Sequence, residues 1–291
     1  LSFWTVDRFF PRNPKFVENF WRCVLLASVV FYVWLLYKFA FVFHNQFLGT
    51  HFDNPTERGG KNSLGWYVME VYPYAFFYFY WARRRIAGGV ALTVLSVALI
   101  YVASRMGWMG ALLAIICVAY FISKTSISKA LKLFLTHAIV VGILAALGWW
   151  FLLNYAGTVE VKKRFLYFFD KSAAPELHTY ENRMGRMQFA FDTFKSAPLF
   201  GVGLRNPSFL ESMGETHNSY LSLLAETGLF GGIPFLAILY FIGRACFRKP
   251  PRLGQVNWMA LASRGSFVAL LFSTAFMQNY SSTHYWIFLG L

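Results

Sequence analysis

The stretch THNSYLSLLAETGLFGGIPFLAILYFIG, residues 216–243, decides the fold class of this chain. From Ser219 onward it is mostly apolar and exceeds the roughly 20 residues that an α-helix needs to cross a bilayer. A polar segment that carries Glu211 and Glu215 precedes it. We therefore predict a transmembrane helix over 219–243, with His217 in its first turn at the membrane surface.

His217 stands at a position that suits a base. The unpaired N–H groups and the positive dipole end of a helix N-terminus disfavour an imidazolium, so the ring stays neutral near pH 7 and can accept a proton. The alternative is a structural histidine that caps its helix or bonds to nearby backbone.

The composition places most of the chain in lipid. Apolar residues make up 57% and charged residues only 14%, while aromatic residues reach 20%. Such a composition indicates an all-α, polytopic integral membrane protein with about seven to eight transmembrane helices. The candidate spans are 23–43, 64–82, 86–104, 106–121, 133–153, 219–243 and 265–280. An apolar run at 285–291 stops before it could cross, and the chain begins at Leu1, so we expect the sequence to be part of a longer protein.

Basic clusters orient these spans. They lie before the first span, after the second, after the fourth and after the sixth, at Arg8–Arg22, Arg83–Arg85, Lys124–Lys132 and Arg244–Arg252. All four fall on one side, which the positive-inside rule makes cytoplasmic. The loop 44–63, the turn at Arg105 and the segment 154–218 then face outward.

The net charge of +14 does not indicate nucleic-acid binding, because the basic residues are dispersed over short loops rather than gathered on a folded face. The outward segment still holds more cations than the rule predicts, namely Lys162, Lys163, Arg164, Arg183, Arg186 and Arg205. This excess requires an anionic partner. We divide the chain into membrane helices at 1–153, a helical cap at 154–218 and C-terminal membrane helices at 219–291. Within the cap, 181–196 has the apolar pattern of a helix that Pro198 ends.

The motifs carry a resemblance to a known family. His217-Asn218, nine further residues, Gly228, two residues and Gly231 satisfy every position of the signature of bacterial O-antigen ligases. The stretch 198–203 (PLFGVG) and the pair Ser104-Arg105 between two spans are similar to the core of the O-antigen ligase and polymerase superfamily, as are Gly49-Thr50 and Asp53-Asn54-Pro55.

The resemblance implies a multi-pass protein of the bacterial inner membrane whose active site faces the periplasm. It also implies further N-terminal helices that this sequence lacks. The implied reaction moves O-antigen glycan from undecaprenyl diphosphate to a sugar hydroxyl of lipid A–core, with inversion at the anomeric carbon. An O-antigen polymerase, whose acceptor is a carrier-linked repeat unit, is the nearest alternative. A transporter or flippase for an anionic lipid is an alternative of another class, although its charges would be expected near the bilayer midplane.

This reaction needs cations for a diphosphate and a base for the acceptor hydroxyl. We predict His217 as the base and Arg105, Arg183 and Arg186 as the diphosphate-binding residues. Arg105 could instead snorkel at a helix turn, and Arg186 could lie on a solvated surface.

We predict supporting roles at this site for Asn218, Glu215 and Arg205. The carboxylate that orients His217 stays open among Asp53, Glu57, Glu181, Glu211 and Glu215. Glu226, about 13 Å further along the helix, is too far to do so and is interpreted as a buried structural acid. The sequence offers no cofactor motif and no cluster with metal-ligand spacing, so we expect metal-independent catalysis.

Overall fold

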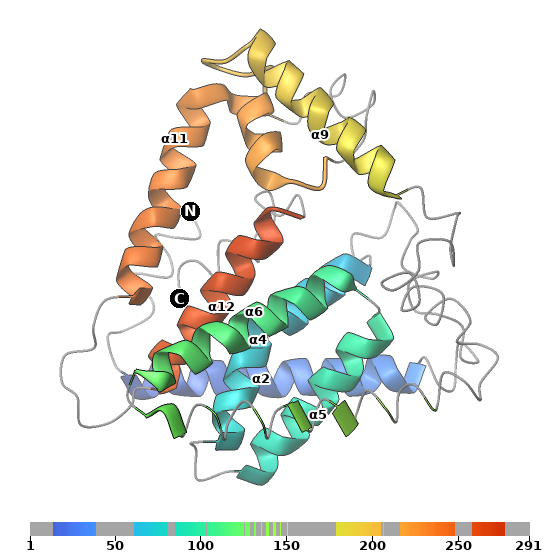
Figure 1. Cartoon of the computed structure of the whole chain (residues 1–291), viewed down its shortest axis with the longest axis vertical. Helices are drawn as coiled ribbons and strands as arrows, with labels where there is room; N and C mark the ends of the chain where they lie inside the picture. Colours follow the sequence, from blue (N-terminus) through green and yellow to red (C-terminus); the bar gives the residue numbers. More distant parts are fainter. Residues whose placement is uncertain are drawn as a thin grey trace. The chain divides into compact units, whose positions relative to one another are not determined.

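The computed structural model describes residues 14–38, 61–80, 85–102, 104–124, 126–128, 179–204, 206, 216–247 and 258–276, with single helical positions between 131 and 150. These residues form helices and turns, without a strand among them (Figure 1). The long helices are α2 (Pro14–Tyr37), α4 (Lys61–Tyr80), α5 (Arg85–Val102), α6 (Arg105–Ser123), α9 (Thr179–Ser196), α11 (Ser219–Phe247) and α12 (Trp258–Thr274).

Most of the predicted apolar runs coincide with helices, but the start predicted at 23 was wrong for α2, whose helix already begins at Pro14 and includes Arg22, hydrogen-bonded to the Tyr78 hydroxyl. The structure places α4, α5 and α6 within three residues of the predicted spans, and α9 within two of the predicted cap helix. The prediction for α12 was wrong at its start, because the helix begins at Trp258 rather than at 265. Arg264 lies inside this helix, and its guanidinium lies over the Phe121 ring, 4.4 Å from the centroid, a contact that stabilises a charged residue there.

Two of the described helices are long and apolar enough to cross a membrane. They are Met106–Ser123 in α6 and Ser219–Phe247 in α11, with mean hydropathies of 2.0 and 1.7. Shorter apolar helices cover Arg22–Tyr37, Ile86–Ile100 and Ala260–Thr274. The protein is thus a helical membrane protein. The larger count of seven to eight spans, and the span at 133–153, are not tested by these helices.

The described residues fall into two compact units. One contains α2, α4, α5, α6 and most of α12, and the other contains α9, α11 and the end of α12. The three-part division at 1–153, 154–218 and 219–291 stays a prediction.

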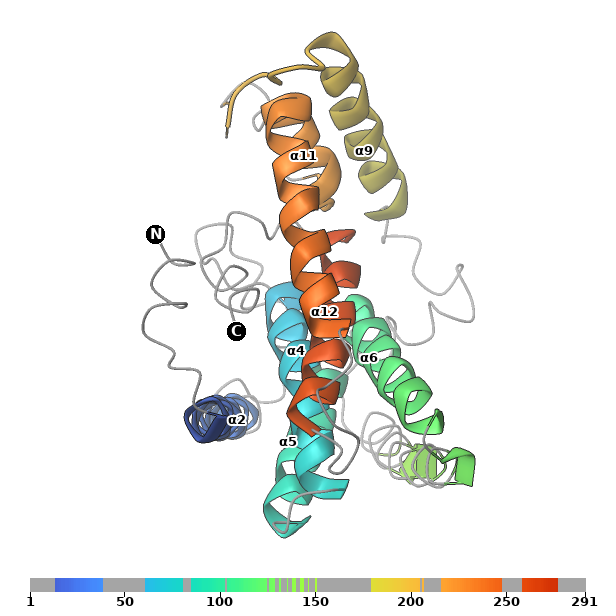
Figure 2. The same ribbon diagram turned by 90° about the vertical axis from the view of Figure 1, so that its left-hand side faces the viewer.

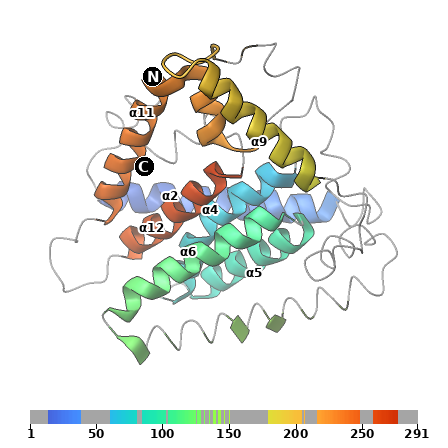
Figure 3. The same ribbon diagram turned by 45° about the horizontal axis from the view of Figure 1, so that its top comes forward.

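In the first of these units, α4 is the central helix. Val68, Met69, Ala75 and Phe76 are fully buried, so α4 is covered on all sides, as an evenly apolar helix should be. Helices α5 and α6 pack beside it, whereas α2 crosses α4 and α5 steeply (Figures 2 and 3).

Glycines let α4 and α6 approach closely at their N-terminal ends. A Cβ at Gly107 would lie 3.0 Å from the Gly65 Cα, and one at Gly65 would lie 2.5 Å from the Ser104 Cβ. Ser104 caps α6, with its side-chain oxygen accepting a hydrogen bond from the Gly107 N–H at 3.2 Å. Arg105, the first residue of α6, is therefore fixed at its backbone by a cap and a tight helix contact.

In the other unit, α11 is not the single straight span that the sequence predicted. Gly228 has φ 62° and ψ −159°, a conformation that essentially only glycine adopts, and the helix bends sharply there (Figure 1). It divides α11 into a first half, 219–227, and a second half, 229–247. The second half is about 28 Å long, which alone matches the hydrocarbon thickness of a bilayer.

Backbone hydrogen bonds hold the bend against the turn that follows α9. Val202 N–H donates to the Ala225 carbonyl and Gly203 N–H to the Glu226 carbonyl, before the bend. After it, the N–H groups of Leu229 and Phe230 donate to the carbonyls of Pro198 and Leu199, at 2.8 and 3.0 Å. We call this pairing of 198–203 with the interrupted helix the bend clamp. It satisfies backbone groups that the break would otherwise leave without partners.

We predict that Gly228→Ala destabilises the protein by about 2 kcal/mol or more, because a side chain there adopts a forbidden conformation and meets the Leu199 backbone. Gly185→Ala is the matched control, since Gly185 lies in α9 with open space around it. Thermal melting in detergent measures both. Equal melting temperatures for the two variants would contradict this account of the bend.

Candidate active site

The first half of α11 packs against α9 through two alanines. Ala190 and Ala225 are fully buried and form a small core with Phe189, Val202 and Leu221. Because alanine side chains are short, the two helix backbones can approach closely at this point. Figure 2 shows α9 running beside α11.

This contact sets the register of the two helices. Arg183 and Arg186 precede Ala190 by seven and four residues, so all three lie on one face of α9. His217 precedes Ala225 by eight residues. The helical rise from the alanines is about 10.5 Å back to Arg183 and about 9 Å back to Ser219, where α11 begins. His217 lies two residues before that start, so the prediction that it belongs to the first turn of the helix was wrong. The two N-terminal ends thus bring the arginines and the histidine to a similar level.

Electrostatics shows that the three side chains influence one another. The pKa of His217 is lowered to about 4, first by burial and then by the positive charges of Arg183 and Arg186. Arg183 and Arg186 are both half-buried. The imidazole is therefore neutral at pH 7, as the sequence predicted, but burial and two guanidinium groups are the reasons here.

His217 has an unusual backbone conformation. Its φ is 54°, and it is the sole non-glycine residue with positive φ in the described part of the chain. Non-glycine residues in this left-handed region are uncommon and cluster at functional sites. Asn218, the next residue, caps α11, because its Oδ1 accepts a hydrogen bond from the Leu221 N–H at 3.0 Å. Asn218 thus supports the site as a helix cap.

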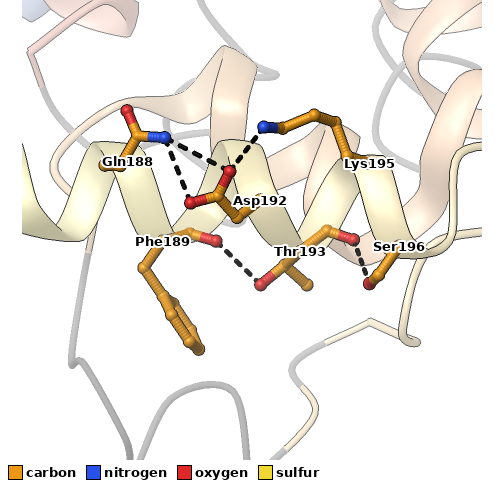
Figure 4. Close-up of polar contacts among 6 residues, drawn as sticks. All are labelled: Gln188, Phe189, Asp192, Thr193, Lys195 and Ser196. Carbon is orange, nitrogen blue, oxygen red and sulfur yellow. Dashed lines mark hydrogen bonds and ion pairs between the residues drawn. The ribbon is translucent and has the colours of Figure 1, made fainter.

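The face of α9 opposite to Ala190 and the two arginines is an ordinary solvated surface. Asp192 accepts hydrogen bonds from Gln188 and forms an ion pair with Lys195, 2.6 Å from Nζ (Figure 4). The Lys195 bond, and then the Gln188 bond, hold the pKa of Asp192 below its usual value. Exposed pairs of this kind contribute little to stability, which makes Lys195 a useful control cation.

The structure does not place the remaining predicted residues relative to this cluster. Arg105 belongs to the other compact unit, so its approach to His217 stays a prediction. Arg205 and Glu215 lie outside the described residues, as do Asp53, Glu57 and Glu211.

Sequence reasoning passed over three buried polar residues. Thr216 and Ser222 lie within a few residues of His217 and contact each other through their hydroxyls. Glu70 is fully buried in α4, where the Trp66 Nε1–H donates to its carboxylate. A lone acid inside an apolar run was the signal for Glu70. The hydroxyl residues gave no such signal.

The described residues contain no group of three or more His, Cys, Asp or Glu side chains that could hold a metal ion. The cations at this site are instead guanidinium groups. Arginine forks match phosphate oxygens, and two of them beside a neutral imidazole offer both anion binding and proton acceptance.

A comparison with protein families decides the classification. The family model described as O-antigen ligase matches residues 89–236, about half of the chain, including Arg105, Arg183, Arg186 and His217. The chain belongs to the O-antigen ligase family. Membership makes it a glycosyltransferase-like enzyme of O-antigen processing, of the ligase or the polymerase type. No curated protein and no solved structure shows significant similarity to it.

We predict that NMR titration of the substrate-free protein gives a His217 pKa near 4. Replacing both Arg183 and Arg186 with alanine should raise it, because two repelling charges are lost, yet burial should keep it below 6.5. Lys195→Ala should leave it unchanged.

The same titration has a consequence for stability. The unfolded chain takes up this proton near pH 6.5 and the folded protein only near 4, so stability should decline as the pH falls through that window. A wild-type His217 pKa of about 6.5 would refute the proposed proximity of the two arginines.

Proposed function

We propose that this protein is an O-antigen ligase that transfers glycan from undecaprenyl diphosphate to a hydroxyl of lipid A–core. The cluster of Arg183, Arg186 and His217 at the α9–α11 contact is the observation that carries the proposal. Family membership supports the reaction class, and the complete signature from His217 to Gly231 favours ligation over polymerisation.

The arginines have a role in donor binding and in bond breaking. Negative charge concentrates on the diphosphate as the glycosidic bond breaks, and fixed guanidinium groups near it stabilise that charge without reorganisation. Arg183 and Arg186 bind the diphosphate in this scheme. We assign Arg105 to the same task from the α6 N-terminus.

His217 acts on the acceptor. Its neutral imidazole accepts the proton from the acceptor hydroxyl while that oxygen attacks the anomeric carbon. The bond between the anomeric carbon and the phosphate oxygen breaks, and undecaprenyl diphosphate leaves. Nucleophile and leaving group occupy opposite faces, so a single displacement inverts the anomeric configuration.

The charges around His217 require the donor to bind before the histidine accepts a proton. A base with a pKa near 4 accepts a proton poorly at pH 7. A bound diphosphate neutralises Arg183 and Arg186, removes their repulsion and raises the pKa of His217. The base therefore becomes effective only when the donor is in place, which protects the site from protonation while it is empty.

The proposal includes a topology. Seven to eight helices cross the bacterial inner membrane, the segments 44–63 and 154–218 face the periplasm, and the site opens on that side. The second half of α11 and α6 are the spans with the strongest support.

We predict that His217→Ala lowers transfer by about 100- to 10,000-fold, which is the typical contribution of a general base. Arg183→Ala should weaken donor use by about 10- to 100-fold, and Lys195→Ala should have no effect. Purified protein with carrier-linked glycan and lipid A–core provides the assay.

The products of this assay separate the candidate functions. Glycan attached to lipid A–core supports a ligase, whereas longer carrier-linked chains would identify a polymerase. Movement of lipid across vesicles without any covalent product would identify a transporter. Full transfer by the His217 variant would remove the base assignment.

We further predict that the acidic limb of kcat lies at a higher pH than the acidic limb of kcat/KM. The first reports the donor complex, in which the diphosphate raises the pKa of His217, and the second reports the free enzyme. In Lys195→Ala the separation should persist. Coincident limbs in wild type would show that donor binding does not change this base.

A further inference from the structure

Two buried hydroxyls surround the backbone of His217. Thr216 and Ser222 are 1% and 0% exposed, and they come from either side of the histidine, one before it and one in the first turns of α11. Thr216 Oγ1 contacts Ser222 Oγ directly. It also lies 3.2 Å from the Asn218 carbonyl oxygen and 3.4 Å from the Asn218 nitrogen.

The Thr216 hydroxyl bonds to both backbone groups of Asn218. It can donate to the Asn218 carbonyl and accept from the Asn218 N–H, a local turn that closes over residue 217. A further hydrogen bond joins the hydroxyls of Thr216 and Ser222, either of which can be the donor.

We call the hydrogen bonds among Thr216, Asn218 and Ser222 the hydroxyl ring, or the ring. The ring connects the residues before α11 to the first half of that helix. The Asn218 carbonyl also accepts the first helical hydrogen bond of α11, from the Ser222 N–H at 3.0 Å. The bend clamp and a hydrogen bond from Tyr220 OH to the Leu271 carbonyl hold that half-helix in turn. Each contact of Thr216 thus restrains the position of His217 relative to α11.

We propose that Thr216, with Ser222 as its partner, is a positioning residue that keeps His217 in its left-handed conformation and so fixes where the imidazole meets the acceptor hydroxyl. The inference rests on the proposed role of His217 as the base. Neither hydroxyl touches substrate. Without the ring, residue 217 relaxes to negative φ and the imidazole moves.

The test uses the full chain in lipid nanodiscs. Thr216→Val removes the hydroxyl at constant size and should lower kcat about 100-fold, because a small misplacement of a catalytic group has that effect. Thr216→Ser keeps the hydroxyl and should recover kcat to within about threefold of wild type. Ser222→Ala retains Thr216 and should show a smaller loss, which keeps the proposal testable if the valine variant folds poorly.

Thr193→Val is the matched control. The Thr193 hydroxyl bonds only within α9, to the Phe189 carbonyl at 2.8 Å, so this variant should keep full activity (Figure 4). Binding of undecaprenyl diphosphate alone should stay at the wild-type level in every variant, since the ring does not touch the arginines.

Two further readouts separate positioning from a structural role. The NMR signal of the His217 imidazole should shift in Thr216→Val and not in Thr193→Val. In the His217→Ala background, Thr216→Val should cause no additional loss. Wild-type kcat with an unshifted imidazole signal, or equal losses of carrier binding, stability and kcat, would overturn the proposal.

The two hypotheses fail in different ways. If His217→Ala alone keeps full activity, the base assignment fails, while the imidazole shift in Thr216→Val still reports whether the ring holds His217. If His217→Ala is inactive but Thr216→Val is fully active, the ring has no positioning role and the proposed function stands.

Discussion

The pairing of residues 198–203 with the interrupted helix α11 is the interaction on which the site depends. A helix that breaks at Gly228 leaves backbone groups without helical partners, and such groups are costly away from water. Four hydrogen bonds from the turn after α9 supply those partners. The same turn fixes where α9 ends, so it sets Ala190 against Ala225 and brings the two arginines and His217 to one level. The hydrogen bonds that stabilise the break in α11 thus also determine how Arg183, Arg186 and His217 are arranged.

That arrangement makes the histidine a weaker base. Arg183 and Arg186 lie close enough to a half-buried histidine to disfavour its protonation. Diphosphate has the charge and the oxygen geometry that two guanidinium groups bind. In the proposed mechanism, donor binding therefore raises the pKa of His217, and the base becomes effective only after the donor has bound.

The sequence predicted the helices better than their interruptions. Apolar runs near 20 residues identified α4 to α6, because length and hydropathy are local properties. The bend at Gly228 was not predicted, because its φ depends on a segment 25–30 residues away in the sequence that packs against it. The sequence could not show for the same reason that the charge of Arg186 acts on His217, and its role in binding diphosphate stays a prediction. Thr216 and Ser222 were missed because a hydroxyl contact has no signature in a single sequence.

A structure of the protein with undecaprenyl diphosphate bound in a nanodisc tests the central claim most directly. The account predicts diphosphate oxygens within hydrogen-bonding distance of the Arg183 guanidinium, with the His217 imidazole facing the position of the anomeric carbon. A diphosphate bound elsewhere, with Arg183 and His217 unchanged from the carrier-free state, would contradict it.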